Sequence, residues 1–105
     1  MGLDDRLTLR VERNGHGPVV HAAGEIDLAT APELRTCLKG LDGLVVVDLR
    51  DVVFLDSAGI GVLIGARNRL AEDRGDLALH NPNDVVSRTL KAVGLQDWID
   101  QQLHT

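Results

Sequence analysis

The feature that most constrains the fold is a change of hydrophobic period at Asp56 and Ser57. Before this point, the runs Leu44–Val47 and Val52–Leu55 are apolar and mostly β-branched, which favours strands. After it, apolar residues recur at helical spacing until Gly75; they are Ile60, Leu63, Ile64, Leu70 and Ala71. Because Leu44–Val47 is continuously apolar, we expect it to be a central strand that is covered on both faces.

Strand and helix patterns also alternate through the N-terminal half. Apolar residues at every second position predict a strand over Leu7–Arg13. Val19–Ala23 resumes an extended pattern, and the turn between the two segments predicts a hairpin. Thr30 and Glu33 then have the spacing of a capping box, which predicts a helix start. Helical spacing continues as far as Asp42–Gly43, so one helix is expected between the hairpin and the central strand.

The C-terminal third continues the pattern. It contains a predicted short strand, Asp76–His80, and a third helix that ends at Gly94 and carries Val85, Val86, Leu90 and Val93. The segment Leu95–Leu103 fits a final strand and a short amphipathic helix equally well. No linker or repeat divides the chain, so we expect residues 1–105 to form one domain. Its predicted fold class is α/β, with a mixed β-sheet and helices packed largely on one face.

Composition excludes several classes of function. The formal net charge is −5, and only Phe54 and Trp98 supply large aromatic rings, so we expect no direct binding to nucleic acid. No apolar run approaches the ~20 residues of a membrane-spanning helix, so we expect no direct membrane contact. The start of the chain lacks a leader pattern and Cys37 is the single cysteine, which together predict a cytoplasmic protein without an intramolecular disulfide. Since Cys37 shares a helix face with leucines, we interpret it as a small buried hydrophobe.

Ser57 occupies the boundary between a predicted strand and a predicted helix. Its hydroxyl is expected near unpaired backbone N–H groups and the positive end of the helix dipole, where an attached phosphate would be tolerated. A simpler interpretation is that Ser57, or Asp56 beside it, only caps the helix and contributes about 1 kcal/mol. The residues alone leave both interpretations open.

Three segments carry a family resemblance. In chain order they are Gly24–Asp27, Val45–Leu49 and Phe54–Leu63. Together they resemble the STAS family, the domains of sulfate transporters and anti-sigma-factor antagonists, and the predicted elements agree with that family over nearly the whole chain. The Asp-Ser-x-Gly sequence at 56–59 is the most specific of these marks. The resemblance implies a single STAS-like domain.

The resemblance to the antagonists of this family implies a phosphorylation switch at Ser57. In those proteins, the matching serine is phosphorylated by an anti-sigma factor that is also a serine kinase. The unphosphorylated form binds this partner and thereby releases a sigma factor, and a phosphoserine phosphatase is a further implied partner. The family's aspartate at the position of Asp27 contributes to the same surface. From the residues alone, Asp27 also fits a charge that only complements the dipole of the first helix.

We therefore expect five partner-binding residues: Asp27, Asp56, Ser57, Gly59 and Ile60. The chain departs from the commonest family motif at Ala58, where a second serine usually stands, and at Ile60, where leucine is common. Ser57 is then the only local phosphate acceptor. We expect no catalytic residue, no cofactor and no metal site, because the histidines are scattered and lack close pairing with other ligands; they are His16, His21, His80 and His104.

Other motif interpretations fit less well. Gly59, Gly61 and Gly65 do not match the dinucleotide fingerprint, and we expect them to let a helix pack closely on the sheet or on a partner. A hydrolase nucleophile elbow requires glycine at the position of Leu55. Asp48 follows a buried strand as in a response-regulator receiver, but the acidic pair and lysine of that site are missing.

Two functions of other kinds are alternatives to the antagonist. The family resemblance also allows a regulatory subunit of a membrane transporter, which would copurify with an ATP-binding cassette protein instead of a kinase. A small hydrolase would turn over an ester, and the substitution Ser57→Ala would abolish that turnover.

Overall fold

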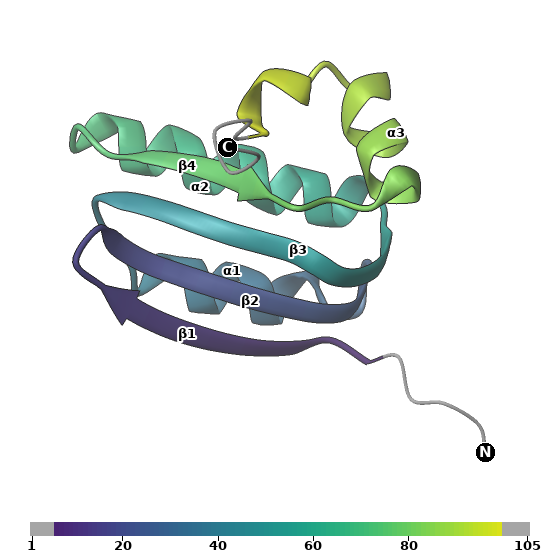
Figure 1. The fold of residues 1–105 in the computed structure, drawn as a ribbon, viewed down its shortest axis with the longest axis horizontal. Coiled ribbons are helices and arrows are strands. Elements are labelled where there is room, and N and C mark those ends of the chain that lie inside the picture. Colours follow the sequence, from purple (N-terminus) through teal and green to yellow (C-terminus); the bar gives the residue numbers. More distant parts are fainter. Residues whose placement is uncertain (1–5, 100–105) are drawn as a thin grey trace.

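In the computed structural model, which describes residues 6–99, four strands form one sheet in the order β1-β2-β3-β4 (Figure 1). The strands are β1 Thr8–Asn14, β2 Gly17–Ile26, β3 Leu44–Leu55 and β4 Asp76–His80. The first two strands pair antiparallel as the predicted hairpin, whereas β2, β3 and β4 are mutually parallel. The carboxyl ends of these three strands therefore lie at the same edge of the sheet.

The helices are α1 Ala31–Lys39, α2 Ser57–Glu72 and α3 Asp84–Ala92. Figure 1 shows α1 and α2 side by side on one face of the sheet, and α3 at the edge where the parallel strands end. Leucine, isoleucine and valine side chains fill the space between this face and the helices. The predicted fold class, a mixed sheet covered largely on one face, is confirmed.

The central strand differs from the prediction in two ways. The runs interpreted as separate strands are one strand, β3, whose pairing with β2 shifts register between His21 and Ala23 and again between Gly24 and Glu25. The expectation that Leu44–Val47 is covered on both faces was wrong, because 61% of Leu44 is exposed. Figure 1 shows α1 and α2 on one face of the sheet, and burial alternates along this segment, with Val45 and Val47 buried and Leu44 exposed.

The predicted end of the third helix at Gly94 is confirmed. Helix α3 ends at Ala92, Val93 is its C-cap, and Gly94 follows with a positive φ of 81°. The sequence fits both a strand and a helix over Leu95–Leu103. In the structure, Gln96–Trp98 form a short 3₁₀ helix and Ile99 makes a parallel bridge to Leu79. Residues 100–103 of that segment lie outside the described residues, and the extent of the domain over residues 1–105 stays a prediction. Within residues 6–99, no helix has the length and apolarity that crossing a bilayer would require.

Candidate functional site

Two aspartates lie side by side where β2 and β3 end. Ile26 and Leu55 are paired at the ends of these parallel strands, and Asp27 and Asp56 follow them directly. The backbone N–H of Asp56 donates to the carbonyl of Ile26 at 3.1 Å, which joins the two turns. The pairing of β2 with β3 therefore places Asp27 and Asp56, two of the expected partner-binding residues, next to each other.

Asp56, and not Ser57, caps helix α2. The Asp56 carboxylate accepts hydrogen bonds from the backbone N–H groups of Ala58 at 2.9 Å and Gly59 at 3.3 Å. Ser57 is the first residue of the helix and is exposed, and its hydroxyl makes no hydrogen bond with any residue from 6 to 99. The sequence allowed either residue to cap α2, and in the structure Asp56 is the N-cap.

Asp27 holds the turn between β2 and α1. One oxygen of its carboxylate accepts hydrogen bonds from the backbone N–H groups of Ala29 and Thr30, each at 3.0 Å. The hydroxyl of Thr30 accepts from the backbone N–H of Asp27 at 2.9 Å and bonds to the carbonyl of Glu25 at 2.9 Å. Asp27 therefore has a structural role in addition to any contact that it makes with a partner.

The predicted capping box at Thr30 and Glu33 is not formed. Thr30 stands at the N-cap of α1, but its side chain makes no capping hydrogen bond because the turn already occupies its hydroxyl. The carboxylate of Glu33 instead pairs with Arg6 at 2.7 Å. The sequence spacing was correct for the helix start and wrong for the hydrogen bonds that fix it.

Gly59 and Ile60 lie beneath the surface of the site. A Cβ atom at Gly59 would come within 2.5 Å of the Ile26 side chain and 2.6 Å of the Leu55 side chain, so glycine allows α2 to start close to both strand ends. Ile60 is only 6% exposed. Both residues were expected to bind a partner, but their burial leaves them little surface for direct contact.

Two exposed apolar residues beside the aspartates were missed in the sequence. Leu28, in the turn after Asp27, is 79% exposed, and Phe54, close to the end of β3, is 46% exposed. Leu28 lies outside any periodic pattern, and Phe54 belongs to a run that reads as a buried strand. An isolated leucine within a turn was the one available sequence signal for an exposed apolar contact.

The open face of the sheet carries a charged cluster that was also missed. The ring nitrogens of His21 lie 2.8 Å from a Glu12 oxygen and 3.2 Å from an Asp48 oxygen, so the expectation of histidines without close partners was wrong for this residue. Its carboxylate partners come from neighbouring strands, which sequence spacing does not reveal. No group of three ligating side chains within residues 6–99 has the geometry to hold a metal ion.

Asp48 is the most tightly held member of this cluster. Burial raises the pKa of its carboxyl group, but hydrogen bonds from the Arg50 backbone and the Asn81 amide, with the charges of Arg50 and His21, outweigh burial and lower that pKa below 3.8. The Asp48 carboxylate is thus a structural anion between strands.

Cys37 behaves as a partly buried thiol on α1. Burial raises its pKa, and its side chain packs against the hydrophobic core. A raised pKa disfavours the reactive thiolate, which agrees with the interpretation of Cys37 as a small hydrophobe.

Comparisons with known proteins give a consistent result. The family model described as "Mlab, STAS domain" matches residues 9–103. The chain is 34% identical over 99 residues to an anti-sigma-B factor antagonist of Bacillus subtilis, an alignment that covers 90% of this chain and 89% of the relative. The crystal structure of an anti-sigma factor antagonist from Mycobacterium paratuberculosis has a TM-score of 0.80 at 27% identity, and 94% and 87% of the two chains are covered. The unphosphorylated form of the anti-sigma factor antagonist SpoIIAA has a TM-score of 0.77 with 92% of each chain covered; at 21% identity it supports the fold alone.

Proposed function

The chain belongs to the STAS domain family, and from that premise we propose that it is an anti-sigma-factor antagonist switched by phosphorylation of Ser57. The antagonist function is supported by curated relatives of that name that match over most of their length. In its unphosphorylated form, the protein binds an anti-sigma factor that is also a serine kinase, and a sigma factor is released. It does no chemistry itself and acts in the cytoplasm, where its partners and ATP are found.

The observation that carries the phosphorylation site is the division of roles between Asp56 and Ser57. Asp56 supplies the helix cap, whereas the exposed Ser57 hydroxyl is held by no described residue. A kinase can therefore modify Ser57 without breaking a hydrogen bond on which α2 depends. The phosphate would sit at the positive end of the helix dipole, which tolerates an anion.

The proposed binding surface surrounds Ser57 at the edge where β2 and β3 end. Asp27 and Asp56 contribute its acidic groups, while Leu28 and Phe54 supply exposed apolar area suited to a protein partner. Gly59 and Ile60 support this surface from below. Phosphorylation adds about 1.5 to 2 negative charges at this surface, which must be desolvated on binding and which repel the carboxylates that the partner brings, so the complex is weakened.

A phosphorylation assay tests the site. Incubation with the cognate kinase and Mg-ATP should add one phosphate, which fragment mass spectrometry should locate on Ser57. Modification of Ser87 or Thr89 instead would refute the assignment. The partner is identified by using Ser57→Ala as bait, since this variant cannot be modified; recovery of an ATP-binding cassette protein and no kinase would favour the transporter alternative.

Calorimetry with three forms of the protein tests the switch. Ser57→Ala should bind the kinase as the unphosphorylated protein does, and Ser57→Asp should bind at least about tenfold more weakly because it adds charge at the contact. Because Asp56 holds the cap, Ser57→Ala should lower the free energy of unfolding by less than about 0.5 kcal/mol. Equal affinity of all three forms would contradict the switch.

A further inference from the structure

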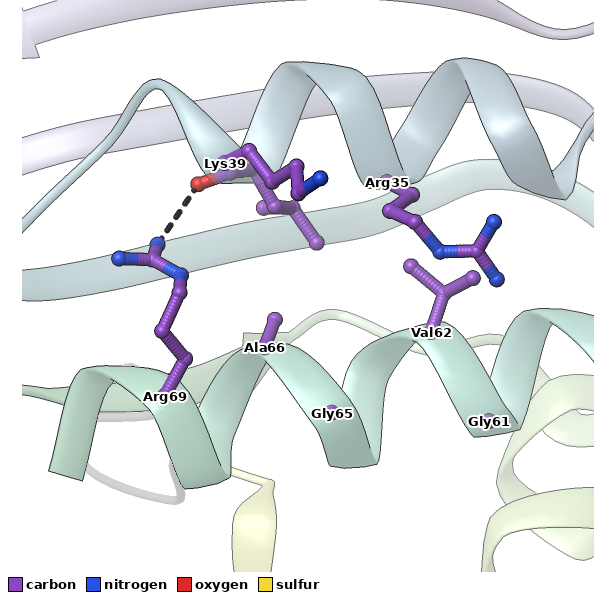
Figure 2. Close-up of a pocket in the computed structure, with 8 residues that line it drawn as sticks. Arg35, Lys39, Gly61, Val62, Gly65, Ala66 and Arg69 are labelled. Carbon is purple, nitrogen blue, oxygen red and sulfur yellow. Dashed lines mark hydrogen bonds between the residues drawn. The ribbon is translucent and has the colours of Figure 1, made fainter. Parts of the chain in front are cut away.

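A groove of about 220 Å³ lies between α1 and α2 and begins one helical turn beyond Ser57 (Figure 2). Its apolar lining comes from Leu38 of α1 and from Val62 and Ala66 of α2. Ser57 and Gly61 are separated by four residues, so they lie on the same side of the helix. The groove is therefore continuous with the surface proposed to bind the anti-sigma factor.

Two glycines keep the α2 side of this groove open. Gly61 and Gly65 are exposed, and a Cβ atom added at either position would meet nothing within 4 Å. Glycine destabilises a helix relative to alanine, so alanine at both positions would make α2 more stable. Gly59 differs, because the sheet leaves no room for its Cβ. The space at Gly61 and Gly65 remains available to another molecule.

The rim of the groove is positively charged in a chain whose net charge is −5. The side chains of Arg35 and Lys39 of α1 have no hydrogen-bond or ion-pair partner among residues 6–99. Arg69 is engaged differently, since it donates to the carbonyls of Leu38 at 2.9 Å and Leu41 at 2.7 Å. No acidic residue lines the groove, so its two unpaired cations favour an acidic occupant.

We propose that this groove receives an acidic amphipathic helix of the same anti-sigma factor that contacts Ser57. The proposal rests on the proposed function and adds a second contact to it. Leu38 and Val62 are only 1% and 4% exposed and form the floor of the groove, so the contact would fall on the half-buried Ala66 and on the exposed backbone at Gly61 and Gly65. Arg35 and Lys39 are one helical turn apart, so they match carboxylates spaced four residues apart on the partner.

A methyl group added in the groove tests partner binding and fold stability separately. Gly65→Ala should leave the fold intact and raise the melting temperature by about 4 °C, because alanine stabilises an exposed helix position. The same methyl group should weaken binding of the purified anti-sigma factor at least about tenfold, since it occupies space that the partner needs. Asn68→Ala is the matched control: it also replaces an exposed α2 residue by alanine, but at a position outside the groove.

Charge reversal tests the rim. Arg35→Glu combined with Lys39→Glu should weaken binding at least about tenfold at low salt, and the loss should shrink as salt is raised. Arg13→Glu combined with Arg74→Glu makes the same change of net charge at the hairpin and at the turn before β4, away from the groove, and should bind as the unmodified protein does.

The outcomes distinguish this proposal from the switch on which it rests. Normal affinity of Gly65→Ala and of the Arg35/Lys39 variant, while Ser57→Asp still weakens binding, overturns the groove and leaves the switch. Weak binding of both groove variants, while Ser57→Asp binds normally, supports the groove and overturns the switch. Equal weakening by the groove variants and their controls would also overturn the groove, since it would show a general effect of charge or helix stability.

Discussion

At the scale of single residues, each aspartate of the site bonds to backbone N–H groups in the turn that follows its strand. Asp27 accepts from Ala29 and Thr30, and Asp56 accepts from Ala58 and Gly59. Either carboxylate thus shapes the segment that it would present to a partner. A substitution that removes only the charge is needed to separate these two roles.

Asp27 provides that separation. Asp27→Ala removes the acceptor for two backbone N–H groups and should lower the free energy of unfolding by about 1–2 kcal/mol, more than the ~0.3–1 kcal/mol expected of a charge that only complements a helix dipole. Asp27→Asn keeps an acceptor oxygen and should retain most of the stability. If the charge also contacts the kinase, both variants should bind it more weakly, and the difference should shrink at high salt.

Thermal unfolding and calorimetry at two salt concentrations measure these effects. Normal affinity of both variants would leave Asp27 as a turn residue that has no direct part in recognition.

Asp48 should give stability a measurable dependence on pH. Its folded pKa is lowered below 3.8, so its contribution is complete at neutral pH and is lost as the pH falls through the lowered value. Asp48→Asn should therefore cost about 1 kcal/mol at pH 7 and much less near pH 2. Urea unfolding at both pH values measures the difference, with the exposed Asp51→Asn as the control. An equal loss at both pH values would show that the ionised carboxylate is not what matters.

At the scale of elements, Gly59 sets how closely α2 approaches the sheet. Gly59→Ala should lower the free energy of unfolding by about 1–3 kcal/mol, because its Cβ would collide with Ile26 and Leu55. Gly61→Ala, two residues along the same helix, meets no atom and should be neutral or stabilising. Chemical denaturation of the two variants checks the contrast, and a similar loss for both would point to the start of the helix, instead of its packing, as the sensitive feature.

The elements themselves were largely predictable from hydrophobic period. The hairpin, α2, β4 and the end of α3 at Gly94 follow local patterns in the sequence, and the structure has them. The continuity of β3 was not predictable in this way, since its polar middle breaks the apolar pattern while pairing with β2 continues through two shifts of register. The capping box failed for a related reason: the Thr30 hydroxyl bonds to Glu25, a contact that helix-start patterns do not describe.

At the scale of the whole molecule, the site depends on topology more than on sequence spacing. Asp27 and Asp56 are far apart in the chain, and only the parallel pairing of β2 with β3 places them together. The residues alone predicted a strand-to-helix turn at Ser57, and the family resemblance connected Asp27 to it. The cluster around His21 could not be predicted, because it depends on which strands are neighbours and on which face the helices leave open.

The separation of the helix cap from the exposed hydroxyl also has a consequence for how such proteins evolve. Asp56 caps the start of α2, and the Ser57 hydroxyl makes no hydrogen bond with any residue that the structure describes. A change of one codon at position 57 can therefore remove the acceptor hydroxyl, or restore it, while the fold is left almost untouched. Under the switch proposed for Ser57, a duplicated gene would become a permanently active binder in a single mutational step and would return in another. Selection can thus act on the control of the protein independently of its stability.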